Sequence, residues 1–200
     1  MEFVWIRHGM TEGNRSKKYI GGQTDEGLCK DGEAELFFEK ERGLYPQVDI
    51  VYVSPMRRCL ETADILYPDV KKQVVEGFRE CDFGMFENKN AQELEMVAEY
   101  QEWLLGNGQA AFPGGESPQG FCERSVRALL RLLEKEKVPE RAAFVVHGGT
   151  IMAVFSTLDE EKKGFYDYHV ENGSGYFCKA MYEEGKLKQQ QCRMLEKHKF

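Results

Sequence analysis

The chain has 200 residues, which is enough for one α/β domain with a substantial buried core. Its formal net charge of −7 disfavours nucleic acid as a partner, because proteins that bind the phosphate backbone present basic surfaces. No apolar run approaches the ~20 residues of a membrane span. Arg7 and His8 interrupt the first apolar run too early for a signal peptide, so we expect a cytoplasmic protein.

Short apolar runs that are typical of buried strands alternate with segments whose apolar residues recur at helical spacing. The predicted strands are 3–6, 48–53, 73–75 and 142–147, followed by a hairpin of 176–181 and 186–193 turned at Glu184-Gly185. The predicted helices are 31–42, 55–67 with Ser54 as its N-cap, 90–104, 116–136 and 150–155. This alternation predicts a three-layer α/β/α fold, in which helices cover both faces of a mostly parallel central sheet.

Two of the predicted strands end at a histidine that is followed by glycine. The first runs into Arg7-His8-Gly9, and the strand of 142–147 ends at His147 before Gly148. Ligands of open α/β sheets bind just beyond the carboxyl ends of the strands. Because the chain has only four histidines, two at strand ends indicate a shared site. The glycine turn after His147 opens a helix, whose free N-terminal amides suit an anion.

Further charged side chains follow other strands. Arg57 and Arg58 lie on the first turn of a predicted helix, although two adjacent arginines are more often simply solvated. The acidic and aromatic segment 80–87 is either a solvated loop or the source of a carboxyl group with a raised pKa. Guanidinium groups bind phosphoryl oxygens in pairs, and a neutral imidazole can attack phosphorus. The pattern therefore favours phosphoryl transfer that needs no metal and no cofactor.

Six cysteines are scattered through the chain without a C-x-x-C pair or a zinc-type spacing. They raise a Cys/His metal site as an alternative, but their spacing gives it no support. We therefore expect reduced and mostly buried thiols.

Taken in order, these motifs resemble the histidine phosphatase superfamily, which is also called phosphoglycerate mutase-like. The matching residues run along nearly the whole chain. They are Arg7-His8-Gly9, Asn14, Gly22 with Leu28 and Gly32, Ser54 to Arg58 with Thr62-Ala63, Glu80, Phe83-Gly84, Glu87, Gly115-Glu116-Ser117, Arg124 and His147-Gly148-Gly149.

The resemblance implies a phosphoglycerate mutase-like fold and a set of site residues. In that set His8 is the nucleophile that forms a phosphohistidine, with its Nδ1 bonded to backbone near Gly9, and Glu80 is the proton donor. The remaining implied residues bind the phosphoryl group. Arg7, Arg58 and His147 do so as catalytic residues, and Asn14, Gly22 and Gly148 make further contacts with the phosphate. No metal or cofactor is implied.

A short sequence between Glu87 and Glu116 predicts one histidine phosphatase domain over 1–200 with a small cap segment at about 86–116. This compact frame favours a phosphomonoester hydrolase that acts on a small phosphorylated metabolite, and it most resembles the alpha-ribazole phosphatases. The alternatives are a phosphoglycerate mutase and a non-catalytic module that binds phosphorylated ligands. A homodimer is considered alongside a monomer.

Overall fold

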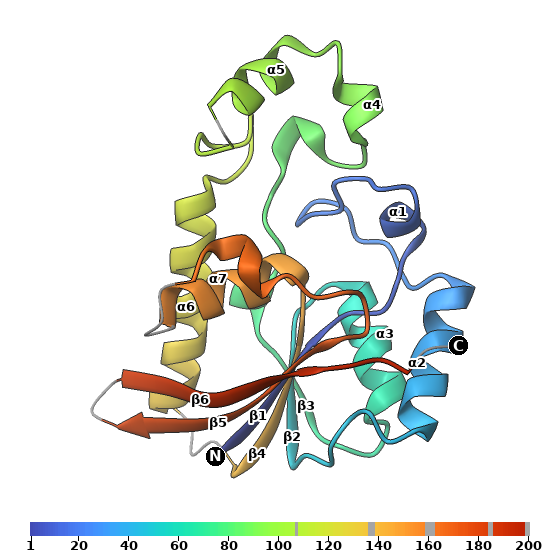
Figure 1. The fold of residues 1–200 in the computed structure, drawn as a ribbon, viewed down its shortest axis with the longest axis vertical. Coiled ribbons are helices and arrows are strands. Elements are labelled where there is room, and N and C mark those ends of the chain that lie inside the picture. The colour runs from blue at the N-terminus through green and yellow to red at the C-terminus, as the bar shows by residue number, and fades with distance from the viewer. Residues whose placement is uncertain (107, 136–138, 159–162, 184–185, 199–200) are drawn as a thin grey trace.

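The computed structural model describes residues 1–106, 108–135, 139–158, 163–183 and 186–198 (Figure 1). In this part of the chain one sheet has six strands in the order β3-β2-β4-β1-β5-β6. The strands are β1 (Glu2–Arg7), β2 (Ile50–Val53), β3 (Lys72–Val74), β4 (Arg141–Val146), β5 (Gly175–Glu183) and β6 (Lys186–Leu195). The first four pair parallel with one another, whereas β5 pairs antiparallel with both β1 and β6, which confirms the mostly parallel sheet.

Helices lie on both faces of the sheet (Figure 1). The helices are α1 (Glu12–Arg15), α2 (Lys30–Glu41), α3 (Arg57–Leu66), α4 (Ala91–Leu94), α5 (Ala98–Leu105), α6 (Pro118–Lys135) and α7 (Gly148–Leu158). Short 3-10 turns are η1 (Glu76–Phe78), η2 (Gly84–Phe86) and η3 (Phe165–Tyr168).

Alternating residues of β1 supply two separate apolar cores. Phe3 and Trp5 pack into the core that contains side chains of α6 and α7, whereas Val4 and Ile6 pack into the core of α2 and α3. All four are at most 1% exposed, and full burial stabilises each such side chain by about 1.5–3 kcal/mol. Because β1 is buried on both faces, the sheet that contains it lies between two layers of helices, and the predicted three-layer fold is confirmed.

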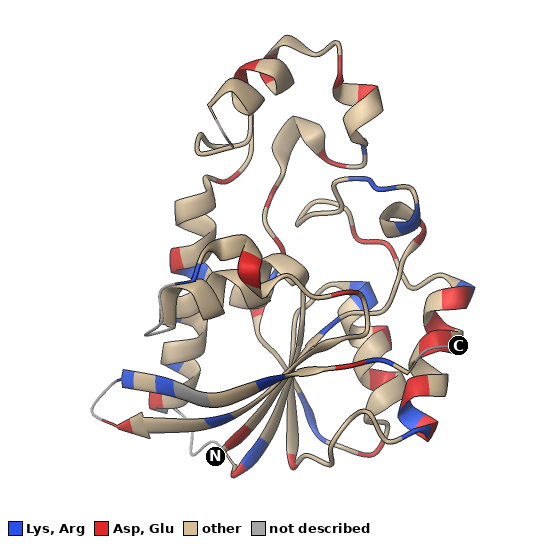
Figure 2. Ribbon diagram, viewed as in Figure 1, with Lys and Arg blue, Asp and Glu red and all other residues tan. Residues whose placement is uncertain are grey.

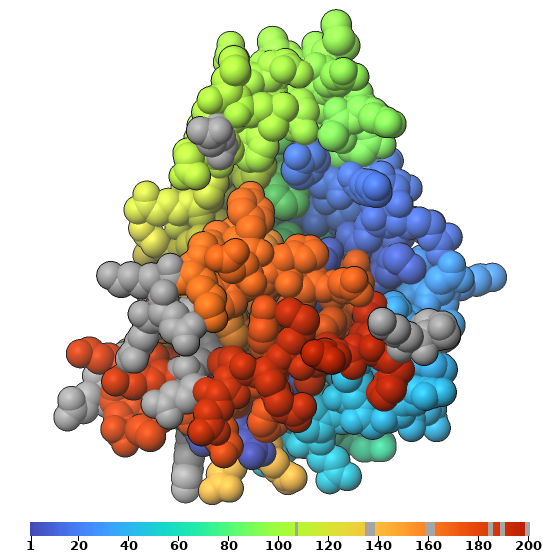
Figure 3. Space-filling view, in the orientation of Figure 1, coloured from blue at the N-terminus to red at the C-terminus, as the bar shows by residue number. Residues whose placement is uncertain are grey.

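The segment 86–116 rises beyond the sheet and contains α4 and α5 (Figure 1). We call it the cap. The predicted single helix 90–104 is interrupted, because the backbone of Val97 is extended between the two helices. Leu94 and Tyr100 from either side of this break both enter an aromatic core with Phe86 and Phe112. Bridges Lys18↔Asn90 and Tyr19↔Glu87 join the cap to the segment after α1, and Figure 3 shows the two surfaces in contact.

The predicted start of the third helix is wrong by two residues. The helix begins at Arg57 with Met56 as its N-cap, and Ser54 does not cap it. The Ser54 hydroxyl instead contacts the His147 imidazole, at 2.7 Å from Nε2. The Ser54 hydroxyl thus bonds a residue 93 positions away and the Met56 amide, but no amide within the helix.

The expectation of reduced cysteines is also wrong at one pair. Cys178 in β5 and Cys192 in β6 form a disulfide next to an irregularity in the pairing of these strands. Their separation of 14 residues is uninformative in the sequence, and only the antiparallel pairing brings the sulfurs together. The other four cysteines are free thiols, three of them buried. The hairpin itself is present, but its predicted turn at Glu184-Gly185 lies outside the described residues.

None of the helices in the described ranges combines the length and apolar character needed to cross a membrane.

Candidate active site

The register of the two central strands brings the two strand-end histidines together. In the parallel pair of β1 and β4, Arg7 lies opposite Val146, so the next residue of each strand is a histidine. The His8 amide donates to the Val146 carbonyl at 2.9 Å. The ring centroids of His8 and His147 are 5.2 Å apart, and both side chains are buried. This arrangement follows from sheet topology, since the residues are far apart in the chain.

The His8 ring has a defined orientation. Its Nδ1 lies 2.7 Å from the Gly9 carbonyl oxygen, which can only accept, so Nδ1 carries the proton and donates. Burial lowers the pKa of His8 well below its ordinary value, and Arg58 and Arg7 lower it further. The imidazole is therefore neutral at pH 7, with an unprotonated Nε2. The Gly9 amide donates to Thr62 Oγ1 at 3.0 Å, which attaches this loop to α3.

The adjacent arginines at the start of α3 have different environments. Arg57 is exposed and pairs with Glu61, with Nε 2.6 Å from Oε1. Arg58 is fully buried, and its guanidinium donates to the carbonyls of Thr24 at 2.8 Å and Gly21 at 3.1 Å. Only the second arginine therefore reaches the space beside the histidines.

Arg7 comes from the end of β1 and donates from Nη1 to the Val170 carbonyl at 2.8 Å. The Nε atoms of Arg7 and Arg58 are both buried and without a hydrogen-bond partner among the described residues. A buried donor without an acceptor costs about 1–3 kcal/mol, and more when the group is charged. Two such donors beside two neutral imidazoles suit one anionic ligand.

Glu80 supplies a buried carboxyl group at the N-terminus of α7. Its Oε1 accepts from the Cys81 amide at 2.9 Å, and its Oε2 accepts from the Gly149 amide at 3.3 Å. Burial raises the pKa of Glu80, against the lowering effect of these amides and of Arg58. The raised pKa favours the protonated form, which is the form that a general acid needs.

The backbone around Glu80 is fixed by a bidentate ion pair. Arg124 of α6 binds Glu116 through Nε at 2.8 Å and Nη2 at 2.7 Å. Its Nη1 donates to the carbonyls of Gly77 at 3.1 Å and Arg79 at 2.9 Å. Glu116 in turn accepts from the Asp82 amide at 3.0 Å. The pair therefore positions the backbone on both sides of the acid.

Glu87 does not enter the site but organises the loop next to it. Its carboxylate accepts from the amides of Gly21 at 3.0 Å, Gln23 at 3.2 Å and Phe83 at 3.2 Å. The carbonyl of Gly21 binds Arg58. Glu87 therefore supports the loop that fixes the buried arginine.

Asn14 is linked to His8 by Asn172, a residue that the sequence analysis did not predict to be in the site. Its Oδ1 accepts from Asn172 Nδ2 at 3.0 Å, and the same Nδ2 is 3.1 Å from the His8 carbonyl oxygen. With Oδ1 bonded in this way, the amide group of Asn14 is left to donate. Asn172 lies in no motif, since it is brought here by the turn before β5.

The two glycines predicted to contact phosphate differ. Gly148 lies against Arg7, since a Cβ atom built on Gly148 would be 3.3 Å from the Nε of Arg7. The Gly22 amide instead donates to the Cys81 carbonyl at 2.8 Å, and a Cβ would lie 2.8 Å from the Glu80 carbonyl oxygen. The Gly22 N–H is therefore used within the protein, where the two backbone segments pass closely, and the predicted contact of Gly22 with phosphate stays a prediction.

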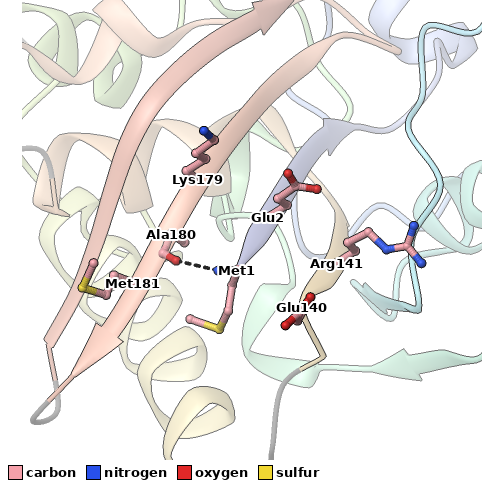
Figure 4. A pocket seen from close by; sticks show the side chains of 7 residues that line it. All are labelled: Met1, Glu2, Glu140, Arg141, Lys179, Ala180 and Met181. Atoms are coloured by element: carbon pink, nitrogen blue, oxygen red, sulfur yellow. Dashed lines mark hydrogen bonds between the residues drawn. The ribbon is translucent and has the colours of Figure 1, made fainter.

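Two other features lie outside this cluster. A surface pocket of about 510 Å³ is lined by Glu2, Arg141 and Lys179, among others (Figure 4). Glu2 begins β1 whereas His8 follows its end, so this pocket lies at the opposite edge of the sheet. Within the described ranges, no three His, Cys, Asp or Glu side chains are grouped in a way that could hold a metal ion.

Comparison with known proteins places this geometry in a family. Residues 3–192 match the histidine phosphatase superfamily (branch 1). A protein of Salmonella typhi described as a probable phosphoglycerate mutase, GpmB, is 30% identical over 162 residues, covering 79% of this chain and 74% of its own.

Two solved structures are also similar. Phosphoserine phosphatase from Entamoeba histolytica has 25% identity and a TM-score of 0.74, with 96% of each chain covered. The alpha-ribazole phosphatase from Shigella flexneri has 22% identity and a TM-score of 0.79, covers 95% of each chain, and supports the fold alone. The chain belongs to the histidine phosphatase superfamily.

Proposed function

We propose that this protein is a metal-independent phosphomonoester hydrolase that acts through a phosphohistidine on His8. The observation that carries the proposal is the pair of buried Nε donors of Arg7 and Arg58, which have no hydrogen-bond partner in the described part of the chain and lie beside two neutral imidazoles. A tetrahedral phosphoryl group offers several anionic oxygens to such donors at once.

In the first step, His8 Nε2 attacks phosphorus, and the bond between phosphorus and the ester oxygen breaks. The departing oxygen takes the proton of Glu80 and leaves as an alcohol. Arg7, Arg58 and His147 stabilise the charge on the remaining phosphoryl oxygens through the transition state. In the second step, water attacks the phosphohistidine, gives a proton to the Glu80 carboxylate, and releases inorganic phosphate and free His8.

The charge of the cap supports hydrolysis over the mutase alternative. A mutase that keeps its substrate for re-phosphorylation must bind an ester with additional anionic groups. Segment 86–116 contains six glutamates, and Lys89 is its only Lys or Arg. Figure 2 shows this acidic character above the sheet. Such a cap repels anionic leaving groups and offers them only Lys89 as a counter-charge.

The substrate that we propose is a small phosphorylated metabolite, with alpha-ribazole 5'-phosphate as the first candidate and phosphoserine as another. Their support is the set of similar proteins, whose printed names include both activities. Phosphorylated metabolites are cytoplasmic molecules, so the expected location is part of the proposal.

The test combines a substrate panel with active-site labelling. Phosphate release is measured over phosphorylated metabolites that include both candidates, and interconversion of 2- and 3-phosphoglycerate is measured in parallel. His8→Ala should abolish turnover and the acid-labile labelled phosphoenzyme, while His169→Ala, which replaces an exposed histidine, should retain both. Labelling that persists in His8→Ala would refute the assigned nucleophile, and isomerisation without phosphate release would favour the mutase.

A further inference from the structure

The fully buried Ser54 contacts the second histidine of the site. Ser54 follows β2, and its Oγ lies 2.7 Å from His147 Nε2. Both side chains have no exposed surface, so water does not compete for this hydrogen bond. Ser54 is 93 residues from His147 in the chain and reaches it because β2 and β4 are neighbours. The reaction steps above leave Ser54 without a role.

The surroundings of the hydroxyl group indicate which atom donates. The Met56 amide donates to Ser54 Oγ at 3.4 Å, so one lone pair of the oxygen is engaged. Among the described residues, the single hydroxyl proton then has two candidate acceptors, the His147 ring nitrogen and the Cys59 thiol, which interacts with Ser54. An imidazole nitrogen is a far better acceptor than a thiol sulfur. Donation of the Ser54 O–H to Nε2 therefore satisfies the hydroxyl group better than donation to the thiol.

This direction determines the tautomer of the imidazole. If Nε2 accepts, the proton of a neutral ring must sit on Nδ1. Burial lowers the pKa of His147 well below its ordinary value, and Arg58, His8 and Arg7 lower it further, so the ring is neutral at pH 7. Cys59 Sγ lies at nearly equal distances from the two nitrogens, 3.6 Å from Nε2 and 3.8 Å from Nδ1. It therefore competes with neither nitrogen for a directed strong hydrogen bond.

We propose that Ser54 is a positioning residue that sets the Nδ1–H tautomer of His147, so that Nδ1–H is the donor to the phosphoryl group. The assignment of the phosphoryl group as the acceptor from Nδ1–H rests on the proposed function, whereas the tautomer of His147 does not.

The two imidazoles then have the same tautomer but present different nitrogen atoms to the phosphoryl group. His8 donates from Nδ1 to the Gly9 carbonyl and presents a bare Nε2 as a nucleophile. His147 accepts at Nε2 from Ser54 and presents Nδ1–H as a donor. An acceptor beside one ring and a donor beside the other are sufficient to separate a nucleophile from a stabilising group.

The direct test is the proton position in the unliganded protein. Long-range proton–nitrogen correlation spectra of histidine-labelled protein report the protonated ring nitrogen, and His147→Asn assigns the signal. We expect the Nδ1–H form in the wild type and in Ser54→Thr, which keeps the hydroxyl group. We expect a mixture or the Nε2–H form in Ser54→Ala. An Nε2–H form in the wild type would overturn the proposal, even if Ser54→Ala does not fold.

The kinetic test separates this role from a structural one. Ser54→Ala should lower kcat for p-nitrophenyl phosphate by about 10-fold or more, as expected when one transition-state donor is lost. Ser54→Thr should restore it. Ser125→Ala removes another fully buried hydroxyl, one without a hydrogen-bond partner among the described residues, and should leave kcat unchanged. An unchanged tautomer in Ser54→Ala would refute the inference. The expected tautomers without any phosphatase activity would instead refute the proposed function.

Discussion

Gly149→Ala is expected to displace Glu80, the proposed proton donor, without unfolding the protein. Gly149 is the second residue of α7, and its amide donates to Glu80. A Cβ at this position would lie 3.1 Å from Glu80 Cδ and 3.2 Å from Oε2, and closer still to Oε1. Carbon atoms in contact prefer about 3.5–4.0 Å, so the carboxyl group must retreat by roughly 0.5–1 Å.

The size of the effect follows from this displacement. A misplacement of about 1 Å can reduce a rate by about 10²-fold, so we expect a loss of that order in kcat for alkyl phosphates. The loss should be much smaller for p-nitrophenyl phosphate, because p-nitrophenolate leaves without needing a proton. Alanine is favoured over glycine within a helix by about 1 kcal/mol, so urea unfolding should show little loss of stability.

Two further variants isolate the cause. Gly106→Ala makes the same chemical change where the nearest atom to the new Cβ is 3.5 Å away, and it should behave as wild type. In a Glu80→Ala background, Gly149→Ala should cause no additional loss, because the carboxyl group that it displaces is absent. Equal losses of Gly149→Ala on both substrates, or a further loss in the Glu80→Ala background, would refute the reasoning.

Three other predictions concern the same groups. Because the pKa of His8 is lowered, the rate should not fall as pH passes ~6.5, the ordinary pKa of histidine, but only at lower pH. At higher pH the rate should fall as Glu80, whose pKa is raised, loses its proton. A kcat/KM profile should show both decreases, and the decrease at high pH should be absent in Glu80→Gln. His147 is also neutral when folded, so stability present above pH ~6.5 should decrease as pH falls, and urea midpoints of His147→Asn should show a shallower decrease. Glu116→Gln should slow alkyl phosphate hydrolysis by about tenfold because it weakens the ion pair with Arg124 that positions the backbone around Glu80. Glu123→Gln, which breaks an exposed pair 3.9 Å long between Glu123 and Arg127 of α6, should not slow it, and equal rates for the two variants would contradict this role of Glu116.

The residues of the site differ in how well the sequence predicts them. His8 and His147 are predictable because each follows an apolar run, and burial of a strand is a local pattern. The choice of Arg58 over Arg57 depended on the family resemblance, because two adjacent arginines look alike without their partners. The structure then separates them by burial, since Glu61 pairs with one and the carbonyls of the 21–24 loop bind the other.

Other features could not be predicted, since they depend on which strands are neighbours. Asn172 reaches the His8 loop, and Ser54 reaches His147, only in the observed strand order. The disulfide of Cys178 and Cys192 likewise depends on the antiparallel pairing of β5 and β6.

The sequence by itself determined the layered α/β class and the strand ends at which reactive side chains gather, because the alternation of apolar and polar residues is set over a few neighbouring positions. The tertiary structure alone decided which hydrogen-bond partner each buried polar group received. Some of those partners are neighbours in the chain, such as Gly9 for His8, whereas Ser54 is 93 residues from His147. Burial makes these partners, rather than water, set the tautomers and the protonation states of the site.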